Sequence, residues 1–415
     1  MAALFLAMPL LSAGNSFLGA LIAVRLNQSG QVALTIGLVM ALHSFGFVLG
    51  SLHAGRIIQA VGHIRAFAGM AGLTCCFALA FPMLEPVLAW AGLRLGLGFT
   101  SAAMLSVIES WIAARANRQN RGRLLAEYNL VFYLASAGGQ YLIGVVPLDG
   151  YFPFSIAAMV IVLSLVPLAL GRTDAPAPSA SGALGLGALY RLTPLAAVGA
   201  VLAGVCSGAF VMMGPVYGLR SGMDPLEVSQ FMALSVLAAM VSQAPVGWFS
   251  DRLGRLPTLI AICALSMALA LLLVLVPGLP PGARVACAAA VFGGIATVYP
   301  LSVAMANDRL EITQILPAAT TLLLGFGLGN CFGPIIVAFL IGTLGAAGFF
   351  GFFAAVLAVL LVLAVRRQLI APEPEHEPVY YVTAPAMGTA VIAEQAPLLA
   401  EEHQPDPIAP TGESR

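Results

Sequence analysis

Long apolar runs separated by short polar segments make up most of the chain. A membrane-spanning helix needs about 20 mostly apolar residues, and many runs here reach that length. Polar segments such as "RLNQSGQ" and "PGLPPGAR" mark where one run ends and the next begins. The pattern predicts an all-α integral membrane protein with twelve transmembrane helices, over residues 2–24, 32–54, 66–83, 86–110, 124–146, 152–170, 194–218, 226–248, 258–277, 284–305, 314–342 and 345–365.

The composition agrees with a membrane-embedded chain. Hydrophobic residues account for 60% of it and the mean hydropathy is +0.97, whereas soluble domains average about 45–50% apolar residues. The net charge is zero, and all eighteen cationic residues are arginine. We therefore expect the lipid bilayer as the surrounding medium and no nucleic-acid partner.

The arginines fall mainly on one side of the predicted helices. If the N-terminus is inside, the inner segments hold thirteen arginines and the outer segments hold only Arg25, Arg220 and Arg284. Inner loops of membrane proteins are enriched in Lys and Arg. The distribution therefore predicts that both termini lie in the cytoplasm.

The predicted helices form two groups of six. Residues 171–193 are rich in Pro, Ala, Gly and Ser and are interpreted as a cytoplasmic linker. Residues 1–170 and 194–366 are the predicted N-terminal and C-terminal six-helix bundles. Residues 367–415 are rich in acids and prolines and are expected to form a disordered cytoplasmic tail.

Short matches relate the two groups to each other. Gly55 and Gly62 recur as Gly247 and Gly254 at an offset of 192 residues, and "LSV" at 105–107 returns at 301–303. Parallel repeats of six helices are a known plan of secondary transporters. The matches predict two pseudo-symmetric bundles.

The stretch "GWFSDRLGRL" at 247–256 resembles the G-x-x-x-D-R-x-G-R signature of the major facilitator superfamily, and "VIESW", "NRGRLLAEYNLV" and "YPLSVAMAN" are similar to its YcaD-like branch of bacterial facilitators. The resemblance runs from about residue 10 to 366. It implies the major facilitator fold, alternating access and a bacterial inner (plasma) membrane. The chain lacks the G-x-x-x-G-P-x-x-G pattern of proton-driven drug antiporters, which makes drug export less expected.

Asp251 is the unusual residue of the signature, because it places an acid on a cationic face. We interpret the stretch as a short loop in which Asp251 reaches a helix N-terminus, where free N–H groups favour an anion. The resemblance implies that this is the N-terminus of the helix that starts near residue 121. A plain turn is the alternative. The first-half copy has Gln59 in place of the acid. The predicted cytoplasmic gate comprises Gly247, Asp251, Arg252, Gly254, Arg255, Glu109, Arg121 and Arg123.

Glu109 belongs to this gate because it emerges near the cytoplasmic end of span 86–110, within reach of the "RQNRGR" arginines. The alternative is a carboxylate in water at a helix end. Arg94 shares the span but lies about 22 Å away at 1.5 Å per residue.

Arg94 and His43 are the candidates for binding and coupling. Arg94 lies deep in the membrane with no Asp or Glu of the first half at its depth, so its guanidinium needs another acceptor, either a substrate anion or the protein itself. His43 lies near the midplane and is the candidate proton carrier, with a hydrogen-bonded core residue as the alternative. Asn15, Asn129, Tyr133, Gln243 and Tyr299 either line the cavity or hold helices together.

These observations predict a monomeric secondary active transporter for a small solute, ion-coupled with H+ as the candidate, and no cofactor or metal. A non-transporting membrane sensor of the same fold is the alternative. An enzyme is not expected, since no nucleophile, metal cluster or acid pair stands out.

Overall fold

The computed structural model describes residues 2–115, 120–170 and 185–370, and these segments are almost entirely helical. The first group of helices is α1 (Ala2–Gln28), α2 (Ala33–Val61), α3 (His63–Ala80), α4 (Val87–Arg115), α5 (Arg121–Val145), α6 (Phe152–Leu163) and α7 (Leu165–Leu170). The second part holds α8 (Leu186–Leu192), α9 (Pro194–Arg220), α10 (Pro225–Leu253), α11 (Arg255–Leu275), α12 (Pro281–Asn307), α13 (Ile312–Leu344) and α14 (Ala347–Ile370).

Twelve of these segments are long enough to span a membrane when α6 and α7 are counted together. Eleven of them, with 152–170 as one, also contain a stretch of 18 residues that is apolar enough to cross a membrane. The twelfth, α5, has 25 residues and carries Glu127, Asn129 and Gln140, which lower its hydropathy. The predicted all-α membrane architecture is confirmed.

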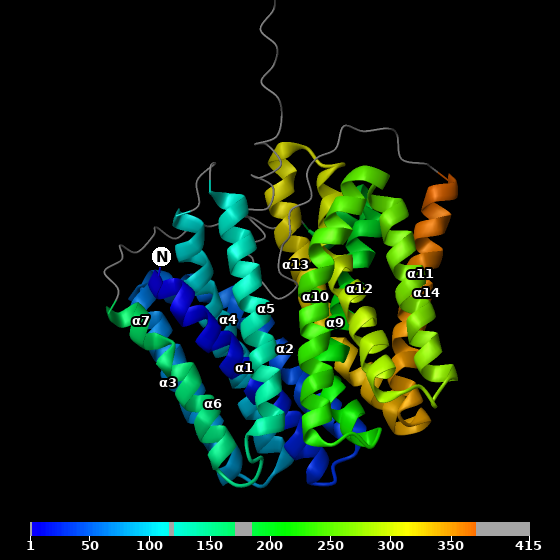
Figure 1. Cartoon of the computed structure of the whole chain (residues 1–415). Helices are drawn as coiled ribbons and strands as arrows, with labels where there is room; N and C mark the ends of the chain where they lie inside the picture. The colour runs from blue at the N-terminus through cyan, green and yellow to red at the C-terminus, as the bar shows by residue number, and fades with distance from the viewer. Residues whose placement is uncertain (1, 116–119, 171–184, 371–415) are drawn as a thin grey trace, which may run out of the picture.

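The helices form two side-by-side halves, α1 to α7 in blue to blue-green and α9 to α14 in green to orange in Figure 1. In the first half α1 packs on α5, α2 on α4 and α3 on α6; in the second half α9 packs on α13, α10 on α12 and α11 on α14. The same pairing occurs in both halves, as the sequence repeat predicts. Both ends of the described chain lie at one end of the bundle, which we call the termini face, and the opposite end is the far face (Figure 1).

The signature stretch differs from the predicted loop. Helix α10 runs through Asp251 to Leu253, and α11 starts at Arg255, so that Gly254 alone forms the turn. The first half repeats this turn at Gly62, between α2 and α3. Gly254 has φ 92° and Gly62 has φ 82°. Only glycine adopts this conformation without strain, and one such residue suffices to reverse the chain.

Two predicted boundaries also change. The predicted linker contains helix α8 over its last residues, and α14 continues to Ile370, into the first residues of the predicted tail. Residues 171–184 of the linker and 371–415 of the tail lie outside the described residues.

The two halves contact each other from the far face to mid-depth. At the far face, Arg220 of α9 donates hydrogen bonds to the Oδ1 of Asn27 at 2.9 Å and to the carbonyl oxygen of Gln31 at 3.0 Å. Towards mid-depth, the rings of Phe45 and Phe332 meet edge to face at 6.0 Å. Helices α2 and α13, and α5 and α10, form the two long seams between the halves.

Candidate functional site

Arg94 and His43 come close together because α4 and α2 pack backbone to backbone. A Cβ atom added to Gly98 would clash with the carbonyl oxygen of His43, and one added to Gly46 would clash with that of Leu95. Small residues allow membrane helices to approach this closely. Arg94 lies one turn from Gly98, at the level where α4 touches the backbone of α2 at His43.

The Arg94 side chain is buried, with the residue only 3% exposed. Its Nη2 donates to the carbonyl oxygen of Met40 at 3.5 Å, a long bond to α2. Its Nε has no hydrogen-bond partner among the described residues, and none of the ion pairs within those residues includes Arg94. One nitrogen therefore braces α2, while another still lacks an acceptor. His43 also lacks a hydrogen-bond partner, since its Nδ1 is buried and has none in the described part of the chain.

The remaining predicted cavity residues are divided between the halves. Asn15 accepts a hydrogen bond from Ser101 of α4 at 3.3 Å. In the second half, Gln243 donates to the carbonyl oxygen of Ala296 at 3.3 Å, and Tyr299 packs against Phe326 with ring centroids 4.8 Å apart.

No hydrogen bond joins Arg94 or His43 to Gln243 or Tyr299 within the described residues. Asn129 and Tyr133 are buried on α5. The structure thus brings Arg94 and His43 together and keeps Gln243 and Tyr299 with the other half.

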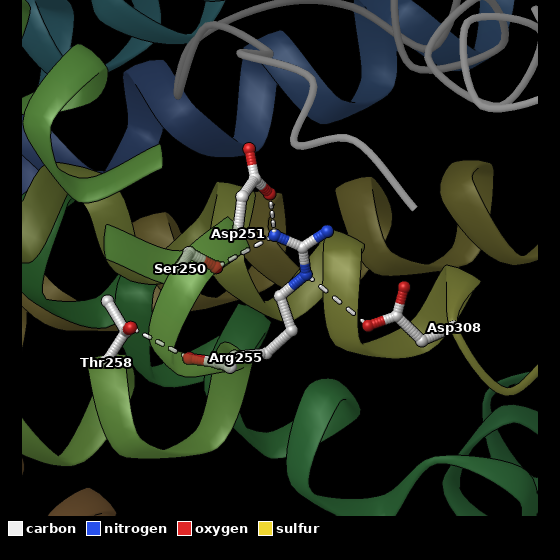
Figure 2. A network of polar contacts seen from close by, with 6 residues as sticks. Ser250, Asp251, Arg255, Thr258 and Asp308 are labelled. Carbon is white, nitrogen blue, oxygen red and sulfur yellow. Dashed lines mark hydrogen bonds and ion pairs between the residues drawn. The ribbon is translucent and has the colours of Figure 1, made fainter. Parts of the chain in front are cut away.

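Arg255 is the centre of a polar network at the termini face (Figure 2). Its Nη1 donates to the Oγ of Ser250 at 2.9 Å and to the carboxylate of Asp251, while its Nε donates to Oδ2 of Asp308 at 3.4 Å. The Arg255 side chain is 6% exposed, whereas the two carboxylates are each exposed by about a quarter. The network ties together the end of α10, the start of α11 and the end of α12.

The other predicted gate residues have separate surroundings. Arg252 stacks over the ring of Trp248, with its Cζ 4.1 Å from the ring centroid. Arg123 pairs with Glu127 of its own helix at 2.7 Å and is largely exposed. Arg121 begins α5, but its side chain lies outside the described part of the structure. The contact of Asp251 with the start of α5 stays a prediction.

Glu109 is fully buried and accepts a hydrogen bond from the hydroxyl of Tyr128 at 2.8 Å. This contact joins α4 to α5 inside the first half. The alternative of a carboxylate in water is therefore wrong, because α4 continues to Arg115, five residues beyond the predicted span. A gating role for Glu109 stays a prediction.

The halves use different chemistry at equivalent turns. His63 follows Gly62 as Arg255 follows Gly254, and His63 stacks on Trp111 of α4 with ring centroids 5.6 Å apart. An aromatic contact in the first half thus occupies the place of the ionic network in the second.

Sequence reasoning missed Ser250 and Asp308 as members of the network. Asp308 lies 53 residues from Arg255 in the sequence. A signal for Asp308 was present in the sequence, because it is an acid shortly after a predicted span on an otherwise cationic face. The same property identified Asp251.

The model of the Major Facilitator Superfamily matches residues 4–316. Together with the two six-helix halves and the glycine turn of the signature, this match shows the class: the chain belongs to the major facilitator superfamily and is a membrane transporter.

Among individual relatives, the chain is similar to the MFS-type transporter YcaD of Salmonella arizonae, with 25% identity over 334 residues, covering 80% of this chain and 86% of that protein. It is 26% identical over 333 residues to an MFS-type transporter of Yersinia enterocolitica, with coverages of 78% and 84%. The predicted resemblance to the superfamily and to its YcaD-like members is confirmed.

Two solved structures share the fold. The nucleoside transporter NupG gives a TM-score of 0.73 at 14% identity, covering 88% of this chain and 97% of that one. A bacterial homolog of the human lysosomal transporter Spinster, in an inward-facing and occupied conformation, gives 0.72 at 13% identity, with coverages of 89% and 95%. At these identities the likeness concerns the fold alone.

Proposed function

We propose that this protein is a secondary active transporter that moves a small solute with an anionic or polar group by alternating access. The proposal places it in a bacterial inner membrane with both termini in the cytoplasm. The arginines support this orientation, because the far face of the described structure carries Arg25, Arg220 and Arg284 and the termini face carries the larger number.

The main observation that supports a solute with an anionic or polar group is the burial of Arg94. A guanidinium within the membrane is costly unless acceptors surround it. Arg94 has a single long bond to a backbone carbonyl, and its Nε is unpartnered among the described residues. A carboxylate or phosphate of a bound solute supplies the missing acceptor and the compensating charge, with charge-assisted hydrogen bonds that are about twice as strong as neutral ones.

The contacts between the halves support alternating access. They extend from the far face to mid-depth, so the conformation described is closed at the far face. In the proposed cycle, a rocking motion breaks these contacts and closes the termini face instead, where Asp251 and Arg255 lie next to the turn of α10 and α11.

His43 is the proposed proton carrier of the cycle. Its Nδ1 is unpartnered among the described residues, and Arg94 is bonded to Met40, three residues before His43 on the same helix. Because a solute anion at Arg94 would lower the cost of a charged imidazole beside it, binding of the anion and of a proton would favour each other.

The test is a thermal-shift screen of the purified protein against pools of small metabolites. An anionic ligand is expected to raise the Tm of the wild type by about 2–4 °C, because a ligand at 100 times its Kd stabilises by about 2.7 kcal/mol. The same ligand is expected to have no effect on Arg94→Gln and its full effect on Arg56→Gln, whose arginine is exposed on α2.

Flux of the identified ligand in proteoliposomes then tests transport itself. We expect uptake in the wild type, with accompanying proton movement that His43→Asn loses and His53→Asn keeps, since His53 is exposed. A ligand that stabilises Arg94→Gln as strongly as the wild type would remove Arg94 from the site. Binding without flux would contradict the transporter proposal.

A further inference from the structure

A small pocket opens at the termini face of the second half, between α9, α11, α12 and α14. It is a shallow depression that is open to solvent. Its polar lining consists of Thr193, Arg309 and Arg367, and its apolar lining includes Leu256 and Met305. The pocket lies at the opposite end of the second half from its contacts with Asn27 and Gln31.

Arg309 and Arg367 are the two cationic residues that line the pocket. Neither takes part in an ion pair among the described residues, and the Nε of Arg367 is buried there without a hydrogen-bond acceptor. Asp308, the acid next to Arg309 in the sequence, is bonded to Arg255. Two guanidinium groups that have no ion-pair partner in the described part of the chain therefore line the pocket.

The start of α9 adds backbone donors to the same pocket. Residues Leu195 and Ala196 line it, in the first turn of a 27-residue helix. Their N–H groups have no acceptor within the helix, Pro194 has no N–H, and Thr193 makes no side-chain cap. The hydroxyl of Thr193 donates instead to the carbonyl oxygen of Leu189 at 3.3 Å. The positive end of the helix dipole thus adds to the field of the arginines.

We propose that this pocket binds a phosphate group, held by Arg309, Arg367 and the first N–H groups of α9. Arginine pairs with phosphate oxygens through two parallel N–H donors. The phosphate comes from an anionic phospholipid headgroup or from a free phosphate. The lining favours the lipid headgroup, because it combines apolar Leu256 and Met305 with two arginines at the end of the spanning helices. The inference goes beyond the transport function and does not depend on it.

The site is adjacent to the polar network of the termini face. Leu256 follows Arg255 and Met305 lies one turn before Asp308, so an occupied pocket would hold α9 and α14 against the ends of α11 and α12 that carry the network. Bound phosphate is therefore expected to stabilise this end of the second half.

The test measures the Tm of the full-length protein in an uncharged detergent. One arm adds phosphatidylglycerol against phosphatidylcholine, and the other adds sodium phosphate against sodium chloride at equal ionic strength. We expect phosphatidylglycerol to raise the Tm by about 2–4 °C. The double variant Arg309→Gln/Arg367→Gln should lose at least half of this rise, while Arg366→Gln, an exposed neighbour that does not line the pocket, should keep it.

The two arms also identify the source of the phosphate. A rise with sodium phosphate that shows the same dependence on the variants supports the site with a free anion as its ligand. No rise in either arm, or an equal rise in the wild type and the double variant, overturns the proposal. Each single variant is measured alongside, so that the result does not depend on the folding of the double variant.

Discussion

Arg255 shows how a charged residue is accommodated at the end of a membrane helix. As the first residue of α11 it lies at the positive end of a helix dipole, which disfavours a cation. Asp251 and Asp308 offset this cost, and Ser250 satisfies a further donor position. Because the two carboxylates come from different helices, one side chain fixes the spacing of three helix ends.

Replacing Arg255 with Gln is expected to lower the free energy of unfolding by about 1–3 kcal/mol. Breaking a buried ion pair costs about 3–5 kcal/mol, and the partial exposure of Asp251 and Asp308 reduces this value. Thermal unfolding in detergent measures the effect. The matched control is Arg252→Gln, which removes an exposed arginine three residues away. Equal changes in Tm for the two variants would contradict a central role for Arg255.

Single glycines determine the geometry of several helices. Gly62 and Gly254 reverse the chain within one residue, and Gly46 and Gly98 let α2 and α4 touch. Gly37 plays the corresponding role between the halves, where α2 meets α13. A Cβ atom at Gly37 would clash with the Cβ of Ala338 and lie 2.7 Å from the carbonyl oxygen of Pro334.

Gly37→Ala is therefore expected to push the halves apart at the far face. Because overpacking costs about 1–3 kcal/mol, the population of molecules that are open at the far face (the far-open state) should rise about fivefold or more relative to the closed one. Pulsed electron resonance between spin labels at the far ends of α2 and α13 measures the populations. Gly55→Ala is the control, because it changes the same helix in the same way where nothing lies within 4 Å. An unchanged distance distribution in Gly37→Ala would show that this contact does not close the far face.

The conformation of the whole molecule is set by contacts between its halves. Arg220 bridges them at the far face through Asn27 and Gln31, which lie 193 and 189 residues away in the chain. Both bonds are broken if the far face opens. They therefore bias the equilibrium towards the conformation described here.

Arg220→Gln is expected to increase the far-open population about three- to tenfold, because each net hydrogen bond contributes about 0.5–1.5 kcal/mol. A membrane-impermeant thiol reagent applied outside intact cells, with a single cysteine introduced on the far half of α5, measures the change and also checks the orientation. Arg284→Gln is the control, since Arg284 bonds to Leu279 within its own half. Equal labelling of the two variants would show that the bonds of Arg220 do not hold the far face closed. Labelling only from the inside would contradict the proposed orientation.

The sequence by itself determined the membrane class, the two six-helix halves and the family. These depend on apolar run length, on repeated glycines such as Gly62 and Gly254, and on a local motif, all of which can be read from the order of residues alone. It also identified Arg94, His43, Asp251 and Arg255 as unusual, because a charged or titratable side chain in an apolar environment is costly wherever the chain places it.

Only the tertiary structure decided what these residues contact. Polar letters in "GWFSDRLGRL" are typical of a loop, but the helix runs through them because one glycine with positive φ completes the turn. Asp308 as a partner of Arg255, Asn27 as a partner of Arg220, and the Arg309 pocket all depend on helices that are distant in sequence. The physical reason is that hydrophobic patterning specifies which segments enter the membrane, whereas the packing of small residues decides which helix ends meet.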